Sequence, residues 1–268
     1  MTEERPAGLI VGGASGIGEA TAHTLVQRGW RVAIADINHE LGNRVAEGLR
    51  ARAGESEASA WRCDVREKES VDLTIKQVAE SFGRLDSVIY SAGYADRMPS
   101  SEVTDDSLAR MVDIQLMGAV RCARAAFPYL RDSERASVVA VSSINAHIGM
   151  PHRLAYSIAK AGLEAMVRTL AVEWAPVGIR VNAVAPSWVL TPMVQAGIDA
   201  GQLDVDELTP WLPLGRLAEV GEIAETIAFL ASPAASYITG QSLLVDGAMT
   251  VRGPWPKGTR PLGGNPPE

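Results

Sequence analysis

Short apolar runs rich in branched side chains alternate with longer amphipathic stretches along most of the chain. The runs are apolar throughout, as is typical of parallel strands with helices on both faces. The alternation predicts an α/β fold of the Rossmann type, a doubly wound parallel sheet of about seven strands with helices on both faces. We expect strands at about 8–12, 31–36, 59–64, 86–91, 137–142, 179–184 and 242–246. We expect helices at about 17–29, 39–53, 67–82, 105–130, 154–175 and 219–231.

The alternation runs on without a low-complexity linker, so residues 1–252 are expected to form one domain. Residues 187–215 are a long excursion between the last two predicted strands, and such excursions are often lids. Residues 253–268 are rich in Pro and Gly and cannot form a core of their own. We expect them to be a tail held by a neighbouring subunit or by the rim of the active site.

Composition excludes several classes of partner. The net charge of −7 argues against nucleic acid and against an anionic membrane surface. The acidic start lacks the features of a secretory signal, and no apolar run is long enough to span a membrane, so we expect a cytoplasmic protein. Cys63 and Cys122 are isolated, which indicates reduced thiols. No metal is expected, because metal-ligand spacing is absent among His23, His39, His147 and His152.

The stretch "VGGASGIG" at 11–18 closes the first predicted strand and opens the first helix. Gly12, Gly16 and Gly18 form G-x-x-x-G-x-G, which allows a tight turn and close approach of the backbone to a diphosphate. The helix N-terminus behind them supplies amides and the positive end of a dipole. A P-loop is excluded because no Gly-Lys-Ser/Thr follows. Glycine turns also join strands to helices in proteins that bind no ligand there, so this turn alone does not establish a dinucleotide site.

Asp36 ends the second predicted strand, eighteen residues after Gly18. A carboxylate there can accept hydrogen bonds from the ribose hydroxyls of an adenosine and would repel a 2′-phosphate. Ser15 and Ile37 beside it are uncharged. Together with the glycine turn, Asp36 predicts NAD as cofactor in preference to NADP.

"AYSIAKAGL" at 155–163 places Tyr156 and Lys160 one helical turn apart. The ammonium would favour the phenolate and lower a phenol pKa that is ordinarily about 10. Such a phenol can exchange protons near neutral pH. The alternative is a lysine that merely covers a tyrosine on a solvated face. Lysine is scarce among the 25 basic residues, which favours a role; the lysines are Lys68, Lys76, Lys160 and Lys257.

Ser142 and Ser143 end the fifth predicted strand, at the edge where open α/β sheets bind ligands. A hydroxyl beside Tyr156 could hold a substrate oxygen while the phenol passes the proton. The serines could instead simply cap the following turn.

An ordered set of motifs resembles a known family. The glycine turn and Asp36 are followed by "CDV" at 63–65, "SAG" at 91–93, a serine thirteen residues before Y-x-x-x-K, and "RVNAVAP" at 180–186. In this order and spacing, residues 6–250 are similar to the compact, single-domain branch of the short-chain dehydrogenase/reductases.

The resemblance implies an NAD(H)-dependent oxidoreductase that transfers a hydride between nicotinamide and a secondary alcohol or ketone. It implies that Ser143 binds the substrate oxygen, Tyr156 is the general acid/base, and Lys160 lowers the tyrosine pKa and binds the nicotinamide ribose. It also implies a homotetramer. With the turn and Asp36, the cofactor residues are Gly12, Ser15, Gly16, Ile17, Gly18, Asp36, Ile37, Asp64, Val65, Ser91, Ala92, Gly93, Tyr156, Lys160, Pro186, Val189 and Thr191.

The chain departs from the family pattern at several positions. Val11 and Ser91 stand where the family usually has Thr and Asn, and Ser187 and Ala248 replace glycines. Gln115 stands in place of an Asn that holds a water on the proton path from the lysine. Its amide is the same on a longer stem, so we expect a working relay with Gln115 in the catalytic set.

The substrate is expected to be a small molecule, namely a mid-sized alcohol, polyol, sterol or cyclic ketone. The expected substrate-binding residues are Ser143, Asn145, His147, His152 and Trp188, with Tyr94, Arg97, Met150, Met193 and Trp211 as further pocket residues. Two other functions remain open. A nucleotide-sugar epimerase or dehydratase shares Y-x-x-x-K but resembles a longer family. A dinucleotide-binding sensor that has lost catalysis would explain the departures at Val11, Ser91 and Gln115.

Overall fold

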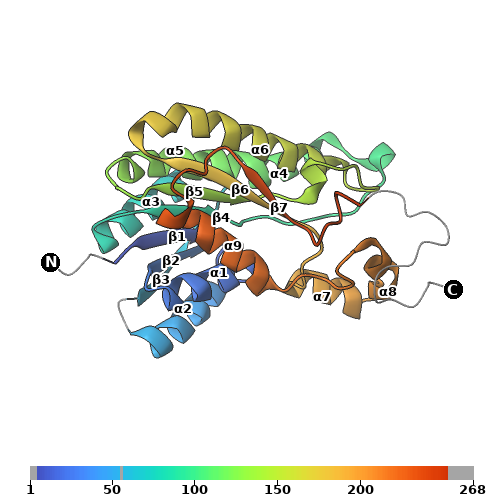
Figure 1. The fold of residues 1–268 in the computed structure, drawn as a ribbon, viewed down its shortest axis with the longest axis horizontal. Helices are drawn as coiled ribbons and strands as arrows, with labels where there is room; N and C mark the ends of the chain where they lie inside the picture. The colour runs from blue at the N-terminus through green and yellow to red at the C-terminus, as the bar shows by residue number, and fades with distance from the viewer. Residues whose placement is uncertain (1–4, 55–56, 253–268) are drawn as a thin grey trace.

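The computed structural model describes residues 5–54 and 57–252. Within them, parallel strands form one seven-stranded sheet in the order β3-β2-β1-β4-β5-β6-β7 (Figure 1). The strands are β1 (Ala7–Val11), β2 (Arg31–Asp36), β3 (Ala58–Arg62), β4 (Ser87–Tyr90), β5 (Ser137–Val141), β6 (Arg180–Pro186) and β7 (Ser242–Val245). The expected Rossmann-type sheet is therefore confirmed, with each strand shifted by at most two residues at either end.

Two helical layers enclose the sheet (Figure 1). Helices α3, α5 and α6 cover one face, and α1, α2 and α9 cover the other. The longer helices are α1 (Gly16–Gln27), α2 (His39–Ala53), α3 (Lys68–Phe82), α4 (Asp105–Val112), α5 (Gly118–Leu130), α6 (Leu154–Trp174) and α9 (Val220–Ala231). Short 3-10 turns are η2 (Ser100–Glu102), η4 (Ile144–Ala146), η5 (Ala175–Val177) and η7 (Pro233–Ala235).

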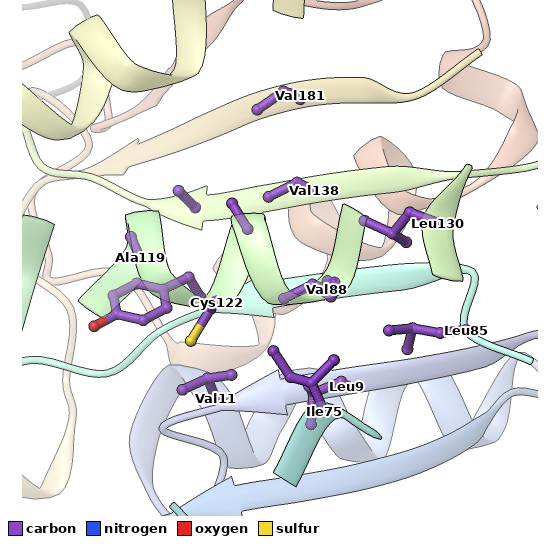
Figure 2. Close-up of a cluster of buried hydrophobic side chains, with 14 of the residues drawn as sticks. Leu9, Val11, Ile75, Leu85, Val88, Ala119, Cys122, Leu130, Val138 and Val181 are labelled. Carbon is purple, nitrogen blue, oxygen red and sulfur yellow. The ribbon is translucent and has the colours of Figure 1, made fainter. Parts of the chain in front are cut away.

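Successive residues of each central strand pack into opposite layers. Leu9 and Val11 lie in the cluster beneath α3, α5 and α6, where Figure 2 shows them with Val88, Val138 and Val181 of the neighbouring strands. Ile10, between the first two, packs into the cluster on the other face. Because both faces are buried, the strands need apolar residues at every position, which explains the uninterrupted runs in the sequence.

The strand order reverses between β1 and β4. Leu9 of β1 pairs with Ala33 of β2 on one side and with Val88 of β4 on the other. The chain runs outward from β1 to β3 and then crosses back to β4. In open parallel sheets, the loops on either side of such a reversal diverge at the carboxyl ends of the strands and leave a crevice for a ligand.

The helix expected over 105–130 is not regular throughout. It is divided by a π-helical turn, η3 (Asp113–Met117). The Gly118 amide donates to the carbonyl of Asp113, five residues back, and the Tyr90 hydroxyl donates to the carbonyl of Ile114. A tertiary hydrogen bond thus takes up a carbonyl that the regular helix would have paired.

The excursion at 187–215 contains α7 (Pro192–Asp199), α8 (Val205–Leu208) and the 3-10 turn η6 (Thr209–Trp211). Helices α7 and α8 lie beyond the carboxyl ends of the strands (Figure 1). The ends of the excursion are joined by a β-bridge between Val189 and Ala218. In it the Leu190 amide donates to the Ala218 carbonyl at 2.8 Å, and the Ala218 amide donates to the Trp188 carbonyl at 2.9 Å. The expected tail at 253–268 lies outside the described residues.

Across residues 5–54 and 57–252, no helix combines the length and apolar character needed to cross a membrane. The same residues contain no group of three or more His, Cys, Asp or Glu side chains that could hold a metal ion. Cys63 and Cys122 are free, buried thiols.

Candidate active site

Two glycines of the turn, Gly12 and Gly18, leave no room for a side chain. Gly12 has φ +78°, and a Cβ there would lie 2.4 Å from the amide nitrogen of Ala92. A Cβ on Gly18 would lie 2.0 Å from the carbonyl oxygen of Gly12. Helix α1 begins at Gly16, and its N-cap residue Ser15 makes no side-chain capping hydrogen bond. The first-turn amides of α1 therefore remain available, so this cradle fits a diphosphate.

Asp36 lies beside this turn, at the end of β2. Its Oδ2 accepts from the Ala14 amide at 3.1 Å and its Oδ1 from the Asn38 amide at 2.9 Å. These bonds fix the carboxylate against the turn. The neighbouring Ile37 is apolar and exposed, so residue 37 itself offers no cation to a 2′-phosphate.

One cavity of about 590 Å³ runs along the carboxyl edge of the sheet. It brings most of the predicted site residues together: Gly12, Ser15, Gly16, Ile17, Asp36, Ile37, Asp64, Val65, Ser91, Ala92, Gly93, Gln115, Ser143, Asn145, Tyr156, Lys160, Pro186, Trp188, Val189 and Thr191. Gly18, His147 and His152 do not line it. Of the further pocket residues, Tyr94, Met150 and Met193 line the cavity, whereas Arg97 and Trp211 do not.

Tyr156 and Lys160 meet Ser143 at the end of the cavity that is nearest to α6. The Lys160 ammonium is buried, donates to the Val141 carbonyl at 2.7 Å, and lies 5.5 Å from the centre of the Tyr156 ring. Ser143 caps the short turn after β5, and its Oγ donates to Oδ1 of Asn145 at 3.1 Å. The end of β5 and the first turns of α6 thus bring a hydroxyl, a phenol and an ammonium to one wall.

The pKa of Tyr156 is shifted in the direction opposite to the one the sequence predicted, and the pKa of Lys160 is also shifted. Burial raises the pKa of Tyr156 above its ordinary value, and the hydrogen bond with Ser143 and the charge of Arg153 only partly oppose this. Burial lowers the pKa of Lys160 to about 7, against the opposing charge of Glu164. For Tyr156 the effect of burial outweighs the groups that favour the phenolate, so the protein alone does not show the lowered tyrosine pKa that the sequence predicted.

Glu164, one turn beyond Lys160, is a buried carboxylate that sequence analysis missed. Its Oε1 accepts from Ser142 Oγ at 2.8 Å and from Ser242 Oγ at 2.6 Å, and lies 3.0 Å from His147 Nε2. His147 is therefore bound away from the cavity, contrary to the substrate-binding role expected of it. The spacing of four after Lys160 was the signal available in the sequence.

His152, also expected at the substrate, lies on the exposed turn before α6. It has φ +62°, and its carbonyl accepts from the Met98 amide at 3.2 Å. Its backbone thus ties this turn to the loop after β4, and its imidazole does not reach the cavity wall.

Gln115 lies in the π-helical turn and is almost fully buried. Its Nε2 donates to the Tyr94 carbonyl, and its Oε1 has no hydrogen-bond partner among the described residues. A Cβ on Gly93 would lie 2.5 Å from that oxygen, so the glycine makes room for the longer side chain. A buried acceptor without a partner indicates a bound water or ligand group.

Three arginines at the cavity were also missed. Arg66 forms a bidentate pair with Asp64, at 3.0 and 2.6 Å, near the ends of β2 and β3. This pair holds the pKa of Asp64 below its usual range. Arg110 and Arg153 line the opposite end, near Tyr94 and Tyr156. Arg153 is the N-cap of α6, and its guanidinium carbon lies 5.9 Å from the centre of the Tyr156 ring.

The parallel sheet, the glycine cradle at its reversal point and the polar wall facing that cradle define a dinucleotide-dependent oxidoreductase. A family model described as enoyl-(acyl carrier protein) reductase matches residues 12–250. Two similar enzymes carry dehydrogenase names. A cis-4-hydroxycyclohexanecarboxylate dehydrogenase from Sinomonas cyclohexanicum is 41% identical over 246 residues, which cover 91% of this chain and 96% of that one. A 2,5-dichloro-2,5-cyclohexadiene-1,4-diol dehydrogenase from Sphingobium indicum is 34% identical over 251 residues, 91% of this chain and 96% of that one.

A solved structure is similar throughout the fold. ElxO with NADP bound superposes with a TM-score of 0.87 at 28% identity, covering 92% of this chain and 100% of that one. The chain belongs to the short-chain dehydrogenase/reductase family.

Proposed function

We propose that this protein is an NAD(H)-dependent oxidoreductase that interconverts a secondary alcohol and a ketone, with Tyr156 as general acid/base. The convergence of Ser143, Tyr156 and Lys160 on one cavity wall carries this proposal. When bound, the nicotinamide cofactor would accept or donate the hydride. The glycine cradle, Asp36 and the loop after β6 are the parts of the chain that would hold it.

The preference for NAD rests on Asp36. Its carboxylate is held beside the cradle by two amides, where ribose hydroxyls can donate to its remaining lone pairs. A 2′-phosphate there would meet a negative charge and the apolar Ile37. The NADP bound by ElxO belongs to that protein, and the local charge at Asp36 argues for the other cofactor here.

The roles of the remaining residues follow from their hydrogen bonds. Ser143 Oγ would hold the substrate oxygen, because it interacts with Tyr156 and its bond to Asn145 lies within the same cavity wall, whereas the Ser142 hydroxyl is bound to the buried Glu164. Tyr156 would pass the proton to or from that oxygen, and Lys160 would stabilise its phenolate. The unpartnered Oε1 of Gln115 suits a water through which the proton reaches solvent.

The substrate class is a cyclic secondary alcohol or its ketone. The wall near Tyr156 is largely apolar and aromatic, with Tyr94, Met150, Trp188 and Met193 among its residues. The names of the two similar enzymes describe six-membered rings with hydroxyl groups, which would fit such a wall.

The test is NADH formation from NAD with a panel of cyclic secondary alcohols. We expect Tyr156→Phe to lower kcat by about 100-fold or more while the protein still binds NAD, because the group that transfers the proton is lost and the glycine cradle and Asp36 remain. Tyr237, which is fully exposed, offers a matched control, and Tyr237→Phe should turn over normally. NADP in place of NAD should give a higher KM. Tight NAD binding with no turnover of any alcohol would instead favour the sensor function.

A further inference from the structure

The charges that line the cavity change along its length. Asp36, Asp64 and Arg66 lie at the end formed by β2 and β3, where the acids predominate. At the other end, near Tyr156, the charged lining residues within the described part of the chain are Arg110, Arg153 and Lys160. No Asp or Glu lines that end, although the whole chain carries a net charge of −7. The substrate end is therefore locally cationic in an acidic protein.

Arg153 is the central residue of this cationic end. It is half-buried at the N-cap of α6, and its Nη1 donates to the Asp96 carbonyl at 2.6 Å. Its guanidinium carbon lies 5.9 Å from the centre of the Tyr156 ring. Within residues 5–54 and 57–252 it forms no salt bridge with a carboxylate. Burial and the nearby charge of Arg97 lower the pKa of Arg153, and the charges of Tyr156 and Asp96 only partly oppose them, yet a guanidinium stays charged at any physiological pH.

The Asp96 charge acts on Arg153 from a distance, but no carboxylate of the described residues is in direct contact with the guanidinium. A half-buried charge of this kind is costly unless a group of opposite charge pairs with it directly. Only one of the five N–H donors of Arg153 is used in the hydrogen bonds described. A carboxylate can accept two of the others side by side, which is the geometry that guanidinium groups favour. The unpaired donors of Arg153 are thus those of an anion-binding site inside the cavity.

Two further arginines extend the positive charge over aromatic walls. Arg110 stacks on the ring of Tyr94 at 5.6 Å, and Arg97 stacks on that of Trp188 at 5.5 Å. Tyr94 and Trp188 both line the cavity. The substrate end therefore offers apolar surfaces for a ring and cations at their margin.

We propose that the substrate is a compact hydroxy acid or oxo acid whose carboxylate binds Arg153, with Arg110 adding to the attraction, while its reacting oxygen meets Ser143 and Tyr156. This inference rests on the proposed function, and it adds the chemical class of the substrate. The guanidinium and the phenol belong to the same helix turn, so one small ring can span from the carboxylate contact to the reacting carbon.

Arg153 also ties the loop after β4 to α6 through the Asp96 carbonyl. If this were its whole role, removing the guanidinium would loosen the cavity for every ligand alike. Comparing the binding of a carboxylate with that of its neutral amide distinguishes an anion-binding role of Arg153 from a purely structural one. The comparison needs no catalytic turnover.

The experiment measures binding of cyclohexanecarboxylate and cyclohexanecarboxamide to the protein saturated with NADH, by calorimetry. We expect the carboxylate to bind about 10- to 100-fold more tightly, in line with hydrogen bonds to a charged group. Arg153→Met should abolish that difference and leave the weak binding of the carboxamide unchanged. Arg153→Lys should retain part of it. Arg44→Met, which removes an exposed charge from α2, is the matched control and should behave as the native protein.

The kinetic arm compares 4-hydroxycyclohexanecarboxylate with its carboxamide as substrates. Arg153→Met should raise KM for the acid by about 10- to 100-fold and leave KM for the carboxamide nearly unchanged, because only the carboxylate loses a charged partner. Any change in kcat that comes from losing the Arg153 charge beside Tyr156 should be the same for both substrates. The proposed carboxylate contact with Arg153 would be refuted by any of three results. These are equal binding of the acid and the amide, no binding of either, and an equal loss of binding of both in Arg153→Met. If the enzyme oxidised only neutral alcohols, the proposed hydroxy-acid substrate would be wrong, whereas the proposed oxidoreductase activity would be supported. Selective carboxylate binding without any turnover would sustain the anion site and contradict the proposed catalysis.

Discussion

Lys160 places an ammonium group in the interior, where its charged form is poorly solvated. It is 5% exposed, and burial lowers its pKa from 10.5 to about 7. In the unfolded chain the same group holds its proton up to about pH 10. Between these two values the unfolded state binds more protons than the folded state, so the free energy of unfolding rises with pH. Below about pH 7 both states are protonated, and folding carries the whole cost of burying the charge.

We therefore expect Lys160→Met to be more stable than the native protein at pH 7, both measured without cofactor. The difference should shrink towards pH 10, by up to about 1.4 kcal/mol per pH unit. Urea unfolding of the two proteins at several pH values from 7 to 9.5 measures it, and subtracting one series from the other removes the titration of shared groups. A difference that is constant across this range would contradict the lowered pKa.

At this scale the sequence predicted which residues share the cavity better than their protonation. Tyr156 and Lys160 lie one helical turn apart, as their spacing predicted, and Ser143 lines the same cavity from the end of β5. Their catalytic roles stay a prediction. The pKa directions could not be predicted, because they depend on how deeply the surrounding layers bury each group. His147 was misassigned for a related reason: its partner, Glu164, comes from a different element and is not visible in the local pattern.

The π-helical turn η3 is held in place by a contact with the end of β4. The Tyr90 hydroxyl, at the end of β4, donates to the Ile114 carbonyl within the turn. Gly118 makes this contact feasible, since a Cβ there would lie 2.3 Å from the same hydroxyl. The turn carries Gln115 into the cavity wall, so the position of Gln115 depends on this bond.

Tyr90→Phe should lower the free energy of unfolding by about 1–3 kcal/mol, the usual cost of leaving a buried polar group unpaired. It should also reduce turnover, since the turn that positions Gln115 loses its support. Chemical denaturation and steady-state kinetics measure the two effects. Tyr237→Phe removes an equivalent hydroxyl from a fully exposed ring and should change neither. An unaltered unfolding midpoint in Tyr90→Phe would show that the bond does not support the turn.

The sequence predicted the existence and order of the elements, because strands buried on both faces and amphipathic helices leave strong periodic patterns. It did not predict the π-helical turn. "VDIQLMG" contains no proline, and its one glycine is compatible with a regular helix. The irregularity comes from tertiary contacts with Tyr90, which local propensity does not encode.

At the scale of the whole molecule, α6 presents apolar side chains to solvent. Leu154 and Ile158 are 43% and 45% exposed, and Val172 is 78% exposed. Their spacing places them along one stripe of the helix, and no described element lies over α6 on this side (Figure 1). Such a stripe on an oligomeric protein is a natural subunit contact. We propose that α6 packs against its copy in a homotetramer.

Sedimentation velocity should accordingly show a tetramer for the native protein. The double variant Ile158→Asp, Val172→Asp should shift it to smaller species, because the contact would bury unpaired charges. Leu73→Asp, which removes an apolar side chain 56% exposed on α3, serves as the control and should assemble normally. A native protein that sediments as a monomer would refute the assembly, and an unchanged double variant would refute the place of α6 in it.

The β-bridge between Val189 and Ala218 closes the intervening segment into a loop whose two ends lie together. Its two ends meet within hydrogen-bonding distance at the edge of the sheet, so the segment between them begins and ends at one place. Because closing a longer loop costs little more than closing a shorter one, that segment can change in length and composition while the strands keep their register. Substitutions in this segment can therefore change the lining of one end of the cavity while the glycine cradle and the position of Tyr156 stay as they are.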